Sequence, residues 1–240
     1  MKKGEILLEI KNPETGEILV IKENCYIQNN ELNNLQMKKL LSKKTAKKIR
    51  SFYHITPDKI KDLDITLSLP REVENIGYLN FKYTNLMNSI NEIKAPGFKI
   101  TPTLFFKKFA SLERVYLPNV LEVSPLTFNK CNNLKSVVFN KVETIGVNSF
   151  CDCNALEEVN GLYNLKELRE CAFADTAIKT IKLPYRIKNL PYACFRNCQN
   201  LEHIDGQFKV VKEHCFRNCK KLKQFPNMED LTEISSSAFS

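Results

Sequence analysis

The sequence of 240 residues has no tryptophan, only three histidines and only seven glycines. None of the histidines (His54, His203 and His214) lies in an HExxH motif, and the glycines form no Walker A sequence, GxGxxG loop or GxSxG turn. Carboxylates are numerous, but no matched acid–base pair stands out among them. We therefore expect a protein that is not an enzyme and that binds no cofactor.

The sequence also lacks a long hydrophobic run. No stretch approaches the roughly 18 apolar residues that a membrane helix needs, and Glu9 and Lys11 break the first apolar segment. We expect neither a signal peptide nor a membrane partner, and hence a cytoplasmic protein unless it is exported by an unrecognised route. In a reducing compartment its nine cysteines, an odd number, are expected to be free thiols.

What the sequence does have is a repeat of about 22 residues. Its clearest marks are seven phenylalanines spaced 22, 22, 23, 22, 21 and 23 residues apart: Phe106, Phe128, Phe150, Phe173, Phe195, Phe216 and Phe239. An aliphatic residue precedes most of them, a cysteine and a leucine follow, and a short strand-like segment comes next. Because such a unit cannot bury its apolar face alone, we expect stacked copies with the phenylalanines in one interior column.

The repeat explains why the sequence CFRNC occurs twice, beginning at Cys194 and at Cys215. The cysteine that follows the phenylalanine by three positions is replaced in other copies by Phe109 or Thr176. We interpret the cysteines as small core residues and predict no metal site. The alternatives are disulfides between successive copies and a zinc site formed by four thiolates, those of Cys194, Cys198, Cys215 and Cys219.

The segments LERVYLPNVLEVSPLTFNKC, from Leu112, and IKTIKLPYRIKNLPYACFRNC, from Ile178, resemble the BspA-like leucine-rich repeats. Units of that family read Leu-x-x-Ile-x-Leu-Pro, then an Ile, then Ala-Phe-x-x-Cys. The resemblance covers about residues 86–240, and LSLP at Leu67 and INEIKAP at Ile90 look like degraded copies. It implies an α/β leucine-rich repeat solenoid with a parallel β-sheet on one face and irregular or short-helical return paths. It also implies a binding module, often for proteins or surface ligands, in a family that is commonly exported.

Residues 1–61 are predicted to form an N-terminal hairpin-plus-helix cap, and residues 62–240 an array of about seven to eight rungs of 21–23 residues, the first of them degenerate. In the cap, NPETG between two apolar runs predicts a β-hairpin over 5–21. Apolar spacing predicts a basic helix over 31–52, and the Thr-Pro start predicts a short helix over 57–63 that runs into the array. The C-terminal end has no such cap, so we expect a partner or self-association there.

The net charge of +9 is concentrated, because residues 32–57 contain seven basic residues and no acid. The simplest interpretation is the solvated face of a cap helix, and the alternative is contact with a polyanion such as nucleic acid or an acidic protein. No aromatic residue is interleaved with the lysines, which disfavours single-strand binding. The candidate residues are Lys38, Lys39, Lys43, Lys44, Lys47, Lys48 and Arg50.

The variable positions that flank each predicted strand should form the exposed face of the sheet. These positions are Glu92, Lys94, Arg114, Tyr116, Ser136, Val138, Glu158, Asn160, Thr180, Lys182, His203 and Asp205. Because this face mixes both charges with Tyr116 and Val138, it suits a protein surface. We predict a non-enzymatic protein–protein interaction module; the alternative is a nucleic-acid-associated or regulatory protein that contacts polyanion through residues 38–50.

Overall fold

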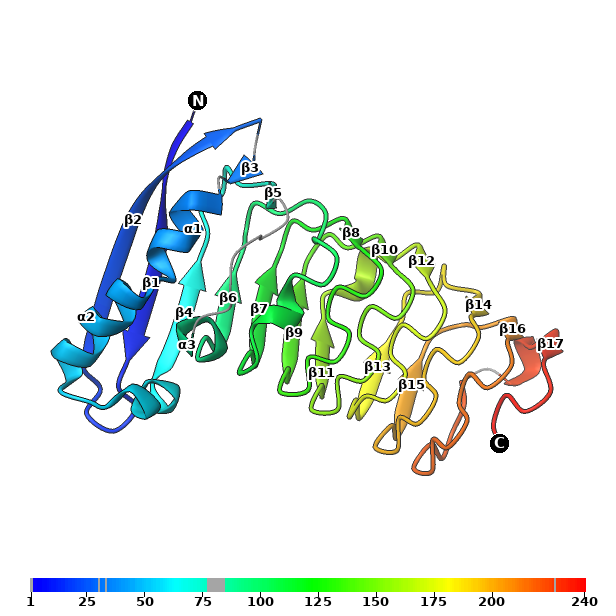
Figure 1. Cartoon of the computed structure of the whole chain (residues 1–240). Coiled ribbons are helices and arrows are strands. Elements are labelled where there is room, and N and C mark those ends of the chain that lie inside the picture. The colour runs from blue at the N-terminus through cyan, green and yellow to red at the C-terminus, as the bar shows by residue number, and fades with distance from the viewer. Residues whose placement is uncertain (1, 30, 33, 77–84, 227) are drawn as a thin grey trace.

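The chain winds into an elongated β-solenoid of about seven turns, with the N-terminal hairpin and helices at one end and the C-terminus at the other (Figure 1). The structure, a computed structural model, describes residues 2–29, 31–32, 34–76, 85–226 and 228–240. Short parallel strands line one side of the solenoid, and the return paths contain little helix. The predicted fold class is confirmed.

Nine strands form the main sheet, in the order β11-β9-β7-β6-β4-β1-β2-β3-β5. They are β1 (Lys2–Lys11), β2 (Ile18–Gln28), β3 (Glu31–Leu32), β4 (Asp64–Ser68), β5 (Asn75–Ile76), β6 (Glu92–Lys94), β7 (Arg114–Leu117), β9 (Ser136–Phe139) and β11 (Glu158–Asn160). From β4 to β11 neighbouring strands are parallel, as stacked rungs require, whereas β1 is antiparallel to both β2 and β4. The hairpin therefore continues the sheet of the array and covers its first edge.

The strand ladder breaks between β11 and β13 (Thr180–Lys182), which pairs only with β15 (His203–Asp205) in a separate two-stranded sheet of the described chain. The break coincides with a turn that is one residue short, since Ile178 follows Phe173 by five positions instead of six. A second set of short parallel ladders follows the other side of the rungs: β8 (Glu122–Val123), β10 (Thr144–Ile145), β12 (Glu167–Leu168), β14 (Asn189–Leu190), β16 (Val210–Val211) and β17 (Glu233–Ile234).

The interior is organised in columns that run along the solenoid. The seven predicted phenylalanines form one column, with neighbouring ring centroids 4.4 to 5.6 Å apart and ring planes within 21° of parallel. All of them except Phe239 are buried. The predicted column is confirmed: each inner ring packs against its equivalents in the rungs before and after it, and the two end rings, Phe106 and Phe239, each stack on one column neighbour.

A recurrent backbone conformation explains the asparagine of CFRNC. Two residues after the phenylalanine the chain adopts a positive φ of 59–62°, at Lys130, Asp152, Asp175, Asn197 and Asn218. Asparagine and aspartate tolerate this left-handed conformation better than most residues. The conformation aims the backbone N–H at the next rung, as in the 2.7 Å bond from Asn197 N to Arg217 O. Asparagine at this position therefore favours the main-chain ladder of the return paths.

The prediction of one helix over 31–52 is wrong. Residues 31–32 form β3, and two helices follow, α1 (Asn34–Leu40) and α2 (Lys43–Tyr53). The break occurs because Ser42 is an N-cap: it has extended backbone angles, and its hydroxyl accepts a hydrogen bond from the N–H of Thr45 at 3.3 Å. The apolar spacing of the sequence continues through Ser42, so that spacing alone does not mark the cap.

The remaining helical segments are short. The helix expected over 57–63 is the 3₁₀-helix η1 (Pro57–Asp62); the others are α3 (Asn85–Asn88), η2 (Phe106–Lys108), η3 (Leu162–Asn164) and η4 (Met228–Asp230). Among the described residues, no helix is both long enough and apolar enough to cross a bilayer. The division into a cap (residues 1–61) and an array (residues 62–240) stays a prediction. β1 of the cap pairs with β4 of the array, so one sheet runs across the proposed boundary.

Candidate functional site

The strands carry the twelve predicted partner-binding residues in two columns. On the main sheet, one column is Glu92, Arg114, Ser136 and Glu158, and the other is Lys94, Tyr116, Val138 and Asn160. On the separate sheet the columns continue as Thr180 with His203 and Lys182 with Asp205. All twelve are exposed or half-buried, and the residue between them on most strands is buried, so each rung alternates as expected. The columns are divided between two sheets, which the sequence did not indicate.

The charges of this face are partly paired with one another. Lys94 Nζ lies 3.6 Å from a carboxylate oxygen of Glu92, and Lys182 Nζ lies 3.2 Å from one of Asp205. Ion pairs on an exposed surface contribute little to stability, so they can exchange for contacts with a ligand. Tyr116, which is 39% exposed, supplies an aromatic side chain among them.

Lys94 and Tyr116 also line a hollow at the carboxyl ends of β4, β6 and β7, with a volume of about 590 Å³. Two further basic residues, Arg71 and Lys99, line the same hollow together with Glu74. The sequence pattern does not mark Arg71, Glu74 or Lys99, because these residues lie in turns and loops outside the strands. The hollow combines an aromatic ring with three cations and one acid, a set suited to an anionic group on a ligand.

The strand face extends onto the N-terminal hairpin. Val20 lies in one cross-strand row with Glu9, Thr66 and Glu92, so it projects from the same side of the sheet as the predicted columns. Three large side chains of β2 are exposed on this side: Ile18 by 51%, Val20 by 44% and Tyr26 by 52%. The hairpin, predicted only as a cap, therefore also contributes to the exposed surface of the sheet.

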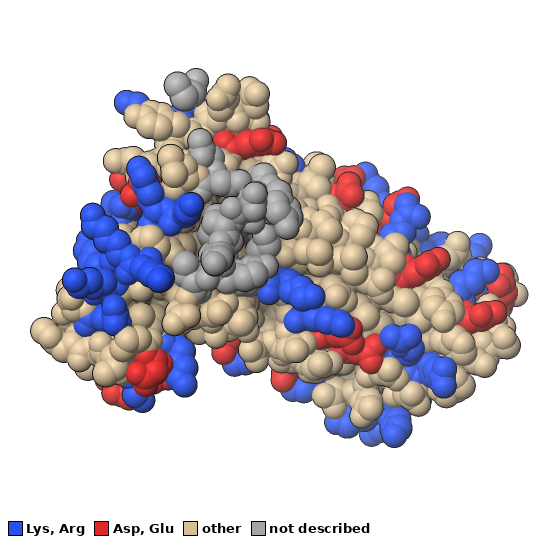
Figure 2. All heavy atoms as spheres, in the orientation of Figure 1, with Lys and Arg blue, Asp and Glu red and all other residues tan. Residues whose placement is uncertain are grey.

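The basic residues gather on the outer side of α1 and α2, where Figure 2 shows a dense group of Lys and Arg side chains. The other side of α2 packs against the core, and its buried residues are Thr45, Ile49 and Tyr53. Of the seven predicted polyanion-binding residues, the six lysines are exposed and Arg50 is half-buried. Within the described ranges, Lys39 alone of these seven has an ion pair, at 3.7 Å from Glu23. The structure therefore brings the predicted polyanion-binding residues together.

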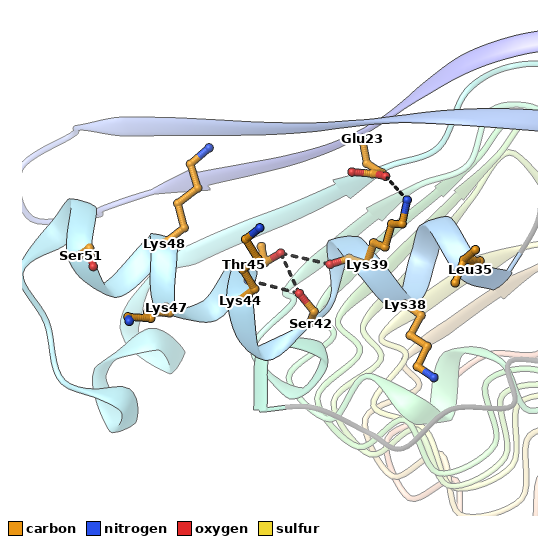
Figure 3. Close-up of a pocket in the computed structure, with 10 residues that line it drawn as sticks. All are labelled: Glu23, Leu35, Lys38, Lys39, Ser42, Lys44, Thr45, Lys47, Lys48 and Ser51. Carbon is orange, nitrogen blue, oxygen red and sulfur yellow. Dashed lines mark hydrogen bonds and ion pairs between the residues drawn. The ribbon is translucent and has the colours of Figure 1, made fainter.

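An open groove of about 1010 Å³ crosses this basic surface. Its lining is Glu23 of β2 together with Leu35, Lys38, Lys39, Ser42, Lys44, Thr45, Lys47, Lys48 and Ser51 of the helices. Figure 3 shows Lys39 and Lys48 projecting toward β2, whereas Lys38 and Lys47 project away from it. The groove thus follows the outer side of α1 and α2, and β2 contributes one residue, Glu23, to its lining.

The cysteines lie inside the repeat and have a bonding role that the interpretation as filler missed. Three of them place Sγ 3.0 Å from the carbonyl oxygen of a phenylalanine in the preceding rung: Cys153 to Phe128, Cys198 to Phe173 and Cys219 to Phe195. Thr176, at the equivalent position, donates its hydroxyl hydrogen bond to Phe173 O of its own rung at 2.9 Å. The slot therefore favours small side chains that can donate a weak hydrogen bond to a buried carbonyl.

Burial raises the pKa of these thiols. The pKa of Cys131 is raised to about 12, and those of Cys194 and Cys215 are raised well above the usual 9.0, in each case mainly by loss of solvent. The thiols are therefore protonated at neutral pH, and a protonated thiol is a weak nucleophile and a poor metal ligand.

The four cysteines considered for zinc do not converge. In the part of the chain that the structure describes, the one group of three potential ligand atoms within 4.8 Å of one another is Cys151, Asp152 and Asp175. Both carboxylate oxygens of Asp175 already accept hydrogen bonds, from Arg196 at 3.0 Å and from Asn197 at 2.7 Å. This cluster is therefore an internally bonded part of the return paths.

Comparison with known proteins identifies the repeat. The model of the BspA type leucine rich repeat region matches residues 20–141, 64–174 and 122–240, with six copies. A leucine-rich repeat protein of T. pallidum (TpLRR) is 23% identical, with a TM-score of 0.57 over 78% of this chain and 95% of that one. A leucine rich cell surface protein of Faecalibacterium prausnitzii A2-165 is 20% identical, with a TM-score of 0.53. That alignment covers 74% of this chain and 48% of the other, about half its length. At these identities the likeness shows the fold alone, and no curated protein sequence matches the chain.

Proposed function

The chain belongs to the BspA-type leucine-rich repeat family, and on this basis we propose that it is a non-enzymatic module that binds a partner protein through its exposed strand face. The observation that carries the proposal is the register of the strands: positions that vary between rungs project to solvent in two columns, and the positions between them are mostly buried. A preformed sheet presents such side chains with little loss of conformational entropy on binding.

Tyr116 and Arg114 are the expected centre of the contact. Tyrosine and arginine are enriched among the residues that dominate binding energies, and Tyr116 also lines the hollow with Lys94. We expect the double substitution Tyr116→Ala with Arg114→Glu to abolish capture of a partner from extracts of the source cell without unfolding the chain.

A matched control lies off the strand face. Tyr163, 60% exposed, and Arg169, which is ion-paired to Glu167 at 2.7 Å, allow the same pair of substitutions. The variant Tyr163→Ala with Arg169→Glu should retain capture. Capture that is unaffected by the Tyr116 and Arg114 substitutions would move the site to another surface.

A second candidate function is contact with a polyanion through α1 and α2. The observation that favours it is the cluster of exposed lysines, of which Lys39 alone has an ion pair in the described chain. Binding to a polyanion should weaken steeply between about 50 and 200 mM salt, because bound cations are released from the polyanion. Reversal of Lys44, Lys47 and Lys48 to glutamate should abolish this binding and leave capture by the strand face unchanged.

Location and self-association stay predictions. The cytoplasmic location rests on the sequence alone, and the F. prausnitzii relative is named as a cell surface protein. At the last rung, Ile234 is 48% and Phe239 44% exposed, which is the apolar surface that self-association would use. Sedimentation of the chain over a range of concentrations would test it.

A further inference from the structure

The free edge of β2 is placed to receive another strand. We propose that it accepts an extended acidic peptide, whose carboxylates the lysines of α1 and α2 neutralise. This inference rests on the second candidate function, whose lysines it uses, and it names the class of polyanion. It is independent of the columns on the array.

The pairing of β2 leaves one of its edges open. β2 pairs with β1 from Ile18 to Ile27, but with β3 only at Ile27 and Gln28. Along 18–26, no strand in the described ranges pairs with the other edge. Main-chain N–H and C=O groups on such an edge are a template for pairing with a further chain.

The hairpin bonds show which main-chain groups face this edge. Asn12 N–H donates to Glu17 O at 2.9 Å beside the turn, and Gln28 pairs with Glu31 in the next hairpin. Bonded and non-bonded pairs alternate along antiparallel strands. Odd-numbered residues of β2 therefore bond to β1, and even-numbered residues point to the free edge. The edge-facing groups are those of Val20, Lys22, Asn24 and Tyr26.

The residues on the two sides of this edge indicate which types of side chain the added strand should carry. On the outer side, Ile18, Val20 and Tyr26 are exposed and would flank apolar residues of the peptide. On the helix side, Lys39 and Lys48 project toward β2 and would flank acidic residues, with Lys39 exchanging its exposed ion pair to Glu23 for a carboxylate of the peptide (Figure 3). Because successive side chains of a strand point to opposite sides, this edge fits a peptide in which acidic and apolar residues alternate.

The lysine surface itself favours an acidic ligand. Lys43 with Lys47 and Lys44 with Lys48 are like-charged pairs four residues apart on α2, an arrangement that destabilises a helix. The first turn of α2 contains no acid, although the helix dipole favours one there. A bound carboxylate would relieve both unfavourable terms.

Two other occupants fit less well. If the β2 edges of two copies paired, the lysine surfaces of both copies would lie beside the same junction and repel each other. Nucleic acid could use the lysines, but it would leave the strand edge unpaired, and no aromatic residue lies between Lys38 and Arg50 for base stacking.

The edge is tested with a fluorescent dodecamer peptide that alternates glutamate with valine, titrated by anisotropy against the full chain. Asn24→Pro removes one edge-facing N–H and leaves the bonds to β1 intact, since proline is tolerated on the open side of an edge strand. We expect it to weaken binding about tenfold or more through the lost bond and the bulk of the ring. Asn24→Ala keeps the N–H and should bind as the unmodified chain does.

The charge requirement is tested by reversing Lys44, Lys47 and Lys48 to glutamate, which should abolish peptide binding. The matched control reverses the same number of exposed lysines at the far end of the array, Lys220, Lys221 and Lys223, and should leave binding unchanged. Hydrogen exchange on the unmodified chain needs no substitution: the peptide should protect the amides of Lys22 and Asn24.

The outcomes separate strand addition from plain polyanion contact. If binding persists in Asn24→Pro, is lost on charge reversal and is matched by oligothymidylate of equal charge, strand addition is overturned and polyanion contact stands. If neither peptide nor oligothymidylate binds the unmodified chain, both are overturned. Absence of amide protection in the peptide complex, or a dimer through β2 in place of peptide binding, would also overturn the proposal.

Discussion

Replacing Phe195 by alanine tests whether the aromatic column holds the solenoid together. The ring is fully buried, and its centroid lies 5.6 Å from that of Phe173 and 5.5 Å from that of Phe216. Burying about 150–250 Å² at roughly 25 cal/mol per Å² stabilises by about 4–6 kcal/mol as an upper bound. Core Phe→Ala substitutions cost about 3–5 kcal/mol, so we expect the free energy of unfolding to fall by that amount.

Urea unfolding followed by circular dichroism measures the loss, and Phe239→Ala is the matched control. Phe239 belongs to the same column but is 44% exposed and stacks on one column neighbour, Phe216. We expect it to cost about 1–2 kcal/mol, because much less area is buried.

Hydrogen exchange then tests how the damage spreads. Because each rung contacts only its neighbours, Phe195→Ala should lower amide protection in the rungs of Phe173 and Phe216 more than in the hairpin. Equal costs for the two variants, or a melt without local loss of protection around Phe195, would refute nearest-neighbour stacking.

Two further predictions concern the backbone and pH. Gly161→Ala should lower the free energy of unfolding by more than about 3 kcal/mol, because φ is +82° and the new Cβ would lie 1.7 Å from Phe139 O. The control is Gly16→Ala, which should cost about 1 kcal/mol because φ is +74° but no atom lies within 4 Å of the new Cβ. Thermal melts compare the two variants. Burial holds the pKa values of Cys194 and Cys215 well above 9.0 in the folded chain. As pH rises, the unfolded chain therefore loses these thiol protons before the folded chain does. The contribution of the two thiols to the free energy of unfolding is complete below about pH 8.5 and falls above it. Urea midpoints at pH 7 and pH 10 check this, and a dependence that the double variant Cys194→Ala with Cys215→Ala does not reduce would contradict it.

The N-terminal cap shows the limits of prediction from local pattern. The hairpin is visible in NPETG and its flanking apolar runs, because turn residues and alternation are local properties. The break at Ser42 is local too, but it competes with a continuous apolar spacing. Capping by the Ser42 hydroxyl at Thr45 N–H, together with the pairing of β3 with β2, overrode that spacing.

The repeat could be predicted from the sequence, because equivalent positions of successive rungs have the same surroundings and therefore favour the same types of residue. The phenylalanine column, the free outward positions and the fold class all follow from that periodicity. Pairings between residues distant in the chain could not be read in this way. β1 pairs with β4, which leaves the far edge of β2 open along residues 18–26. Turns outside the repeat place Arg71 and Lys99 in the same hollow as Tyr116. Such contacts depend on how the hairpin and the degenerate first rungs pack in three dimensions, and no sequence period encodes that packing.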